Sequence, residues 1–331
     1  MVKSSFMREV RVEDAVGMQL GHDLTQIIPG QFKGRLFKAG HIITEEDIPR
    51  LLDIGKRHIY VMEIPVGFLH ENEAAERMAK ALAESQYIEK TEPYEGKVTL
   101  KSAIHGLIKV DPTLVHRVNQ IEGLALATLT SNQVVRPGQP LAGVRPIPLI
   151  IEEEKIAAVE KLSHLPAITV KPFMKKKVGV VTTGSEVLTG RIKDKFGPAV
   201  REKLEQFDSE LVEQRLVNDD LESIVQEIRY FLDRKVDMIL VTGGMSVDPD
   251  DRTPGAIKAS GARIVRYGTP MLPGSMLLIA YHGATPILGL PGCVMHDPFT
   301  SFDVFLPRIL AGETIEEADI TMIGYGGYYT C

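Results

Sequence analysis

Three glycine-containing turns, with acidic side chains in and around them, are the part of this chain best suited to chemistry. They read Thr-Thr-Gly-Ser-Glu at 182–186, Thr-Gly-Gly-Met-Ser-Val-Asp-Pro-Asp-Asp at 242–251 and Gly-Leu-Pro-Gly-Cys at 289–293. Glycine lets a ligand approach the backbone without a Cβ in the way, and backbone N–H groups at a helix start suit a phosphate. The three turns therefore predict a site of phosphate size.

Carboxylates in the same turns indicate a divalent cation beside that phosphate. Asp248, Asp250 and Asp251 lie in the second turn, and Glu186 lies in the first. Carboxylates would repel a bare anion, whereas Mg²⁺ binds one or two carboxylates together with phosphate oxygens. We therefore expect Mg²⁺ to be held by Asp251, Glu186 and Asp250. The alternative is that Asp248 and Asp250 are solvated and that Asp251 caps a helix starting at Thr253.

The elements that must position these turns form a regular alternation of strands and helices after residue 172. We expect strands at 178–183, 211–217, 237–241, 262–267, 275–281 and 286–288, and helices at 197–207, 220–234, after 253 and at 297–310. The strands are short runs rich in Val, Ile and Leu, and the crossovers are of helical length. This pattern predicts an α/β fold with a mostly parallel, doubly wound sheet. In such a sheet ligands bind beyond the carboxyl ends of the strands, where the turns lie.

The first half of the chain reads as a mixed α+β region with small β-barrel-like units. We expect helices at 44–55, 71–85, 112–121 and 152–162, strands at 59–61 and 124–129, and a hairpin at 134–144. We divide the chain into an N-terminal α+β unit (1–66), a helix plus β-rich middle unit with a linker (67–172), the α/β domain (173–312) and a C-terminal tail (313–331).

Composition is that of a soluble globular protein and excludes several other classes. The 331 residues carry a net charge of −6, which argues against a nucleic-acid surface. Two cysteines, Cys293 and Cys331, exclude a disulfide framework or a cysteine-rich metal cluster. The start of the chain lacks the apolar core of a signal peptide, and no stretch is long enough to span a bilayer. We expect a cytoplasmic protein with no nucleic-acid or membrane partner.

Other familiar catalytic motifs are missing from the sequence. It contains no Gly-x-x-x-x-Gly-Lys-Ser/Thr phosphate loop, no Gly-x-Gly-x-x-Gly, no His-Glu-x-x-His and no Gly-x-Ser-x-Gly. Cys293 stands at a helix start, where a thiolate could be stabilised, but a small buried residue is the preferred interpretation. His296 is interpreted as a helix-start residue rather than a ligand.

The ordered set of motifs resembles the molybdopterin-binding domain of molybdenum-cofactor biosynthesis proteins. Besides the glycine turns, the matching segments are Gly-Pro-Ala-Val at 197–200, Val-Asn-Asp-Asp at 217–220, Asp-x-Thr-Pro at 251–254 and Pro-Gly-Ser at 273–275. Each motif is weak by itself, but together they occur in order over residues 175–312.

The resemblance implies a sheet that binds a pterin and its phosphate at the glycine turns. Molybdopterin or its adenylate would be the ligand, with Mg²⁺ and molybdate as the other reactants. The family's catalytic carboxylates fall on Asp219 and Asp251. The residues expected to bind the pterin or its phosphate are Thr183, Gly184, Ser185, Glu186, Gly243, Gly244, Ser246, Pro273, Gly274, Ser275, Pro291 and Gly292.

The two-part architecture of the chain most resembles that of the molybdopterin molybdenumtransferases, or insertases, which replace the adenylate with molybdate. Gly-His-Asp-Leu at 21–24 and Lys-Ala-Gly-His at 38–41 are weakly similar to the insertase's accessory regions. The sequence departs from insertases in three respects. It has no Ser-x-Met-Asp-Gly segment in its N-terminal half, it has Ser185 where insertases commonly place Asp, and too few residues follow 312 for the insertase's C-terminal β-domain.

Three functions remain open from the sequence. The leading hypothesis is Mg²⁺-dependent molybdate insertion with release of AMP, by a homo-oligomer (dimer or trimer). The second is a non-catalytic molybdopterin carrier or sensor with a molybdoenzyme as its client, which would bind pterin without releasing AMP. The third is a nucleotide hydrolase of the competence-damage type, which would turn over a pyridine nucleotide or ADP-ribose without any pterin.

Overall fold

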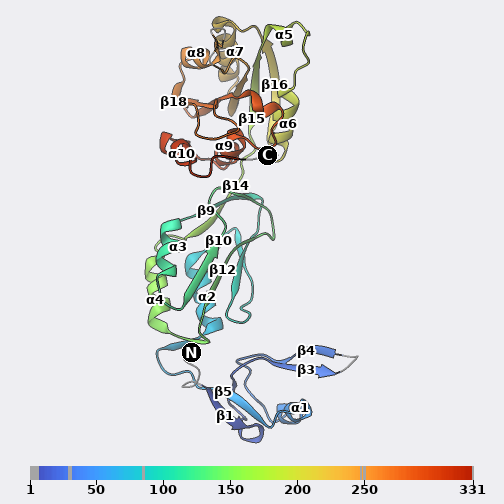
Figure 1. Cartoon of the computed structure of the whole chain (residues 1–331), viewed down its shortest axis with the longest axis vertical. Helices are drawn as coiled ribbons and strands as arrows, with labels where there is room; N and C mark the ends of the chain where they lie inside the picture. The colour runs from blue at the N-terminus through green and yellow to red at the C-terminus, as the bar shows by residue number, and fades with distance from the viewer. Residues whose placement is uncertain (1–6, 29–31, 84–85, 247, 249–250, 330–331) are drawn as a thin grey trace.

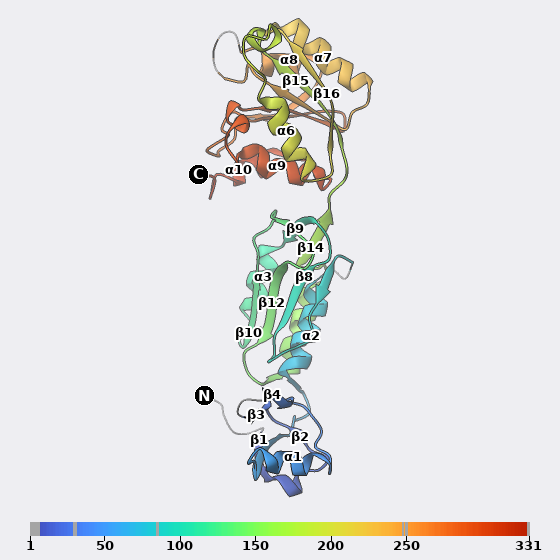
Figure 2. The same ribbon diagram turned by 90° about the vertical axis from the view of Figure 1, so that its right-hand side faces the viewer.

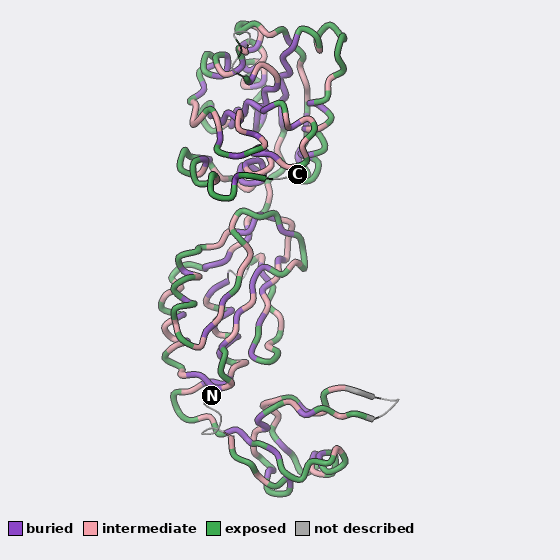
Figure 3. Tube along the Cα trace, in the orientation of Figure 1, coloured by how far each residue is buried: buried purple, intermediate pink, exposed green. Residues whose placement is uncertain are grey.

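The computed structural model describes residues 7–28, 32–83, 86–246, 248 and 251–329. The chain forms three bodies, which follow one another along the long axis of the molecule in the order of the sequence (Figures 1 and 2). Within the described residues, buried apolar side chains form four clusters. Buried residues occur in all three bodies (Figure 3). One cluster fills the N-terminal body, one fills the middle body, and two lie on opposite faces of the C-terminal sheet.

The N-terminal body is a small α+β unit built on a three-stranded antiparallel sheet. Across this sheet the order is β1 (Met7–Arg11), β5 (His58–Met62) and β2 (Gln19–Leu20). A hairpin of β3 (Leu24–Ile28) and β4 (Phe32–Phe37), the 3-10 turn η1 (Val12–Asp14) and the helix α1 (Asp47–Asp53) complete it. Leu20, Leu51 and Val61 are buried where these elements meet.

The middle body packs three helices against antiparallel sheets. The helices are α2 (Glu71–Leu82), α3 (Pro112–Asn119) and α4 (Glu153–Leu162). One sheet contains, in order, β10 (Leu124–Thr128), β12 (Pro140–Pro146), β8 (Val98–Ser102) and β7 (Ile88–Lys90). A second contains β11 (Val134–Val135), β9 (Gly106–Val110) and β14 (Ile168–Pro172), and β13 (Ile150–Glu152) pairs with β6 (Phe68–His70).

The interpretation of 134–144 as a hairpin is wrong. The residues of β11 pair with β9, whereas β12 pairs with β10 and β8, so the two arms belong to different sheets. Val135 and Leu141, one from each arm, are both buried in the same core cluster. The turn between them therefore carries the chain from one sheet to the other, because both arms bury an apolar residue in the space between.

The C-terminal body is the doubly wound α/β domain that the sequence predicts. Its six strands are β15 (Lys177–Thr183), β16 (Glu210–Val217), β17 (Met238–Thr242), β18 (Arg263–Tyr267), β19 (Leu278–His282) and β20 (Thr285–Leu290). Their order across the sheet is β16–β15–β17–β20–β19–β18. The first four are parallel, β19 runs antiparallel to β20, and β18 runs antiparallel to β19. The mostly parallel sheet is confirmed.

Helices cover both faces of this sheet. One face packs against α6 (Phe196–Glu205), α9 (Ser301–Leu310) and α10 (Glu317–Met322), and the other against α7 (Leu221–Asp233) and α8 (Thr253–Ala259). Val180 joins the first cluster and Val181 joins the second, as alternate residues of a strand do. Ile315 and Ile320, from the segment expected to be a tail, are fully buried in the first cluster.

The last long helix begins later than the sequence predicts. A 3-10 turn, η2 (Gly292–Met295), follows β20, and α9 starts only at Ser301. Thr300 and Asp303 form a capping box at that start, which fixes the position of the helix end. Among the described residues, none of the helices has the length and apolar character needed to traverse a lipid bilayer.

A buried carboxylate, Glu313, joins the C-terminal body to the middle body. Its Oε1 lies 2.7 Å from Lys109 Nζ and 3.0 Å from Lys171 Nζ, and its Oε2 accepts a hydrogen bond of 2.7 Å from Arg308. The two lysines belong to the middle body and Arg308 belongs to α9. Burial opposes the charged form, but hydrogen bonds from the three cations outweigh it and lower the pKa of Glu313 to about 2.

The same joint has an aromatic part. The ring of His105, in the middle body, stacks on Phe207 of the C-terminal body at 5.9 Å and meets Phe173, which directly follows β14, edge-on at 5.1 Å. Phe173 and Phe207 are themselves in edge-to-face contact at 4.9 Å. The two bodies are thus held by a charged contact and by an aromatic one.

We expect Glu313→Gln to lower the free energy of unfolding by roughly 3 kcal/mol at neutral pH, the energy that corresponds to the lowering of this pKa. A carboxylate with a lowered folded pKa stabilises above its unfolded pKa, near 4.5, and loses that contribution as the pH falls toward 2. The difference between wild type and variant should therefore shrink over that range in urea unfolding. Glu317→Gln, at an exposed ion pair, should cost less than about 1 kcal/mol. A Glu313→Gln cost that does not change with pH would contradict this account.

Candidate phosphate-binding site

The carboxyl ends of the parallel strands gather the motif turns at one edge of the sheet. In the register Thr182 of β15 lies beside Thr242 of β17, which lies beside Leu290 of β20. The loop 268–277, which connects β18 to β19, opens at the same edge because β19 runs antiparallel to β20. We refer to the ends of β15, β17 and β20, together with this loop, as the glycine edge.

Four consecutive carbonyl groups in the turn after β17, residues 243–246, face hydrogen-bond donors from other elements. Thr253 donates through Oγ1 to the first of these carbonyls at 2.7 Å and through its N–H to the second at 3.2 Å. The hydroxyl of Tyr267 donates to the third at 2.8 Å and lies 3.2 Å from the fourth. Thr253 is fully buried at the start of α8, and Tyr267 ends β18. The 243–246 turn is thus fixed from two sides.

The N–H groups of the same turn, unlike its carbonyls, are mostly unpaired within the described residues. Those of Gly244, Met245 and Ser246 have no hydrogen-bond partner among the described residues. Gly243 and Gly244 have φ values of 86° and 55°, in the left-handed region that favours glycine. Successive N–H groups in a turn of this kind form a concavity that binds anions. The turn therefore has its acceptors occupied and its donors open, which is the arrangement a phosphate requires.

A buried hydroxyl without a partner faces this turn. Thr183 is only 4% exposed, and within the described part of the chain its Oγ1 has no hydrogen-bond partner. A Cβ placed on Gly243 would lie 2.6 Å from this hydroxyl, and one placed on Gly244 would lie 3.5 Å from it. Buried polar groups are normally paired, so the unpaired Thr183 hydroxyl marks the 243–246 turn as a candidate ligand site.

Asp219 lies at the first motif turn. Its Oδ2 accepts the N–H of Ser185 at 3.0 Å, where the short helix α5 (Ser185–Leu188) begins. Gly184 is buried just before it, and Glu186 is exposed on α5. The next carboxylate, Asp220, caps α7 by accepting a backbone N–H, and this hydrogen bond lowers its pKa. Asp219 therefore faces the first turn, and Asp220 belongs to the helix.

Asp251 holds its own loop together instead of capping α8. Its Oδ2 accepts the N–H of Asp248 at 3.0 Å, and the N-cap position of α8 is Arg252. Burial and then the negative charge of Asp251 raise the pKa of Tyr267, which indicates that the two groups are near each other. Asp250 lies outside the described residues. In the described ranges no three acidic, imidazole or thiol side chains gather in a metal-binding cluster.

The two remaining motif segments, 273–275 and 289–293, lie next to α9 and η2. The carbonyl of Gly274 accepts the hydroxyls of Ser301 at 2.6 Å and of Thr269 at 2.9 Å. In the part of the chain that is described, no hydrogen bond links these turns to the 243–246 turn. The remaining predicted residues are Pro273 and Ser275, which are half-buried, Pro291, which is buried, and Gly292, which is exposed.

Sequence reasoning did not identify the roles of Thr253 and Tyr267. Thr253 stands in the Asp-x-Thr-Pro motif, where the following proline indicates a helix start and gives no sign that the hydroxyl holds another loop. Tyr267 belongs to no motif, and β20 and β19 separate its strand from β17 in the sheet. Tyr267 reaches the 243–246 turn because the loop after β17 extends over the ends of β20 and β19. Met245 of this loop packs against Gly289 of β20.

Cys293 is partly buried in η2. Burial, followed by the negative charge of Asp297, raises the pKa of its thiol. The thiol therefore stays protonated at neutral pH, and η2 provides no stabilised thiolate.

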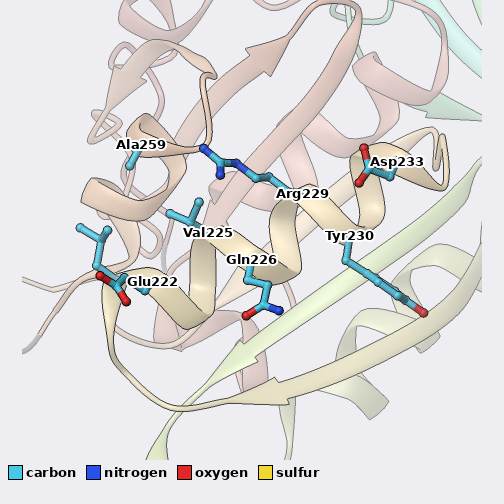
Figure 4. A pocket seen from close by; sticks show the side chains of 8 residues that line it. Glu222, Val225, Gln226, Arg229, Tyr230, Asp233 and Ala259 are labelled. Carbon is cyan, nitrogen blue, oxygen red and sulfur yellow. The ribbon is translucent and has the colours of Figure 1, made fainter.

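A separate, open depression of about 550 Å³ lies along α7 (Figure 4). Glu222, Gln226 and Arg229 of α7 line it together with Ala259 of α8. The ring of Tyr230 also borders it, with two guanidinium groups over the ring and its hydroxyl bonded to a carboxylate of β16. None of the residues predicted to bind a ligand lines this depression.

Family models and known relatives match parts of this chain. Residues 179–311 match the family model described as a probable molybdopterin binding domain, and residues 9–63 match a domain of unknown function (DUF8806). The molybdopterin molybdenumtransferase of Staphylococcus aureus (strain Mu50) is 31% identical over 147 residues, 41% of this chain and 34% of the relative. A CinA-like protein of Mycolicibacterium gilvum is 38% identical over 80 residues, 24% of this chain and 19% of the relative.

A solved structure is also similar to the C-terminal body. The molybdopterin biosynthesis enzyme MoaB of Thermus thermophilus is 27% identical, with a TM-score of 0.35, and covers 42% of this chain and 98% of its own. The chain spans about a third of the length of the molybdenumtransferase that it matches. The C-terminal body is a doubly wound α/β domain. Its residues 179–311 are the part of the chain that matches the probable molybdopterin binding domain.

We expect Gly243→Ala to lower the free energy of unfolding by about 2 kcal/mol more than Gly190→Ala. Both glycines have positive φ, 86° and 75°, so an alanine is strained at either position. A Cβ at 243 would lie 2.5 Å from the Thr183 carbonyl oxygen, whereas nothing lies within 4 Å of one at 190. Urea unfolding of the two variants measures the difference, and equal losses would show that the close approach to Thr183 carries no energy.

Proposed function

We propose that this chain acts in molybdenum-cofactor biosynthesis, binding molybdopterin or its adenylate with the ligand's phosphate in the 243–246 turn. We propose further that it promotes Mg²⁺-dependent insertion of molybdate with release of AMP. The observation that carries the binding proposal is the turn itself, three of whose carbonyls accept hydrogen bonds while three of its N–H groups have no described partner.

A phosphate fits this turn because phosphate oxygens only accept hydrogen bonds at neutral pH. The N–H groups of Gly244, Met245 and Ser246 and the hydroxyl of Thr183 would all donate to it. The carbonyls already face donors from Thr253 and Tyr267, so the N–H groups are the hydrogen-bonding groups of the turn that remain open. The protein's part in binding is therefore a set of donors already in position, which a ligand need not rearrange.

Mg²⁺ is the proposed cofactor, and the carboxylates fit it in part. Asp251 uses Oδ2 to hold its loop, while its Oδ1 has no partner in the described ranges, and Glu186 is exposed at the first turn. Mg²⁺ needs only one or two protein carboxylates when phosphate supplies further oxygens. The ion would neutralise the phosphate charge beside Asp219 and Asp251. These two residues keep their proposed catalytic roles, with Asp219 holding the backbone of the first turn.

The activity rests on similarity over part of the chain, so two other functions are tested beside it. The Staphylococcus aureus relative is a molybdopterin molybdenumtransferase, which supports the insertase proposal. The CinA-like relative favours the nucleotide-hydrolase alternative. A pterin carrier or sensor remains the third. The homo-oligomeric state, the molybdoenzyme client and the cytoplasmic location stay predictions.

Thr183→Val should weaken binding of hydroxymethylpterin phosphate, a stable probe, by about tenfold without loss of stability. The substitution removes a donor to the ligand, and it also removes a buried polar atom that has no partner in the free protein. Calorimetric titration measures the affinity, and urea unfolding measures the stability.

Thr182→Val is the matched control for this test. The Thr182 hydroxyl accepts hydrogen bonds from Gln214 at 2.9 Å and from Thr242 at 3.0 Å. Loss of this hydroxyl should therefore lower the free energy of unfolding by about 1–2 kcal/mol and leave the affinity for hydroxymethylpterin phosphate nearly unchanged. If Thr183→Val bound the probe as tightly as wild type, the phosphate would lie elsewhere.

Asp251→Asn should reduce release of AMP from adenylated molybdopterin by about a hundredfold or more, while pterin affinity changes by less than about threefold. The amide oxygen can still accept the N–H of Asp248, so the loop keeps its support and only the charge is lost. The measurement is chromatography of AMP and pterin after incubation with Mg²⁺ and molybdate.

Wild-type turnover in Asp251→Asn would remove this residue from the chemistry. Tight pterin binding by the wild type without AMP release would favour the carrier, and turnover of a pyridine nucleotide would favour the hydrolase.

A further inference from the structure

The ring of Tyr267 lies beside the 243–246 turn, and its faces are not used by any interaction described above. Its hydroxyl is bonded to the turn, while 38% of the residue is exposed. Among the described residues no aromatic ring and no guanidinium group lies against it. A tyrosine ring at an anion-binding turn is thus fixed at one end and open along its side.

We infer that the open face of Tyr267 is the wall on which the flat heterocyclic ring of the phosphorylated ligand stacks. This inference rests on the proposed function, since that function places the ligand's phosphate in the turn. A ligand with its phosphate on the N–H groups of the turn can extend toward β18, where the Tyr267 ring lies. Stacked aromatic rings need centroid separations of about 4.5–7 Å, and the ring is one hydroxyl group away from the turn's carbonyls.

The anchored hydroxyl makes this ring suitable for stacking. A tyrosine side chain has few torsions, and the hydrogen bond to the Met245 carbonyl holds them, so stacking costs little further conformational entropy. Tyr267 would therefore have two separable tasks, one for its hydroxyl and one for its ring.

Two substitutions separate these tasks. Tyr267→Phe and Tyr267→Leu both lose the hydroxyl that holds the turn, but only the second loses the aromatic ring. We expect both variants of the full chain to bind inorganic phosphate equally, and more weakly than wild type. Hydroxymethylpterin phosphate should bind about tenfold more weakly to the leucine variant than to the phenylalanine variant, as measured by calorimetry.

The outcomes separate a failure of the stacking wall from a failure of the proposed function. Equal affinity of the two variants for the pterin phosphate, with clear binding by wild type, would overturn the wall and leave the proposed function standing. No binding of the pterin phosphate by wild type would overturn both. If AMP distinguished the variants and the pterin phosphate did not, the wall would serve adenine, and the pterin assignment would be wrong.

A second measurement needs no variant to fold. Pterins are fluorescent, and stacking on a phenol quenches their emission. The chain contains no tryptophan, so a nearby indole cannot cause the change. Emission that falls when hydroxymethylpterin phosphate binds to wild type is expected, and unaltered emission on binding would overturn the stacking wall.

Discussion

The parallel register of β15 with β17 is the constraint on which the candidate site depends. It sets Thr182 beside Thr242, and this brings Thr183 so close to Gly243 that no Cβ fits between them. The apolar layers hold this register, because a slip of one residue would exchange Val180 and Val181 between the two faces of the sheet. Apolar packing inside the sheet, several residues away from the edge, therefore decides where the polar atoms at the edge lie.

The glycine edge is a place where stability and binding make opposite demands. A buried hydroxyl with no partner costs about 1–3 kcal/mol in the free protein, and a turn with open N–H groups is similarly unsatisfied. Folded chains keep such groups mainly where a ligand completes them. The hydrogen bonds from Thr253 and Tyr267 limit the cost, since they satisfy the carbonyls and leave only the donors open.

Much of the C-terminal fold could be predicted from the sequence because its signals are local. Short apolar runs that end in glycine predict buried parallel strands, and Thr253 followed by proline predicts a helix start. The roles of Tyr267 and Glu313 could not be predicted, since each acts on a residue brought near only by the folded chain. The error at 134–144 has the same cause, because two sheets share one core there. The residues assigned to the ligand stay predictions, and Asp250 lies outside the described residues.

The joint around Glu313 has a consequence for the shape of the molecule in solution. Lys171 is 44% exposed at its side chain and Lys109 is 27% exposed, so dissolved salt can reach and screen this contact. The aromatic contact of His105 with Phe173 and Phe207 does not depend on charge in the same way. At high ionic strength the charged contact would therefore weaken more than the aromatic one. The joint between the two bodies would then be the part of the molecule that responds to salt, because each body is folded around its own apolar core.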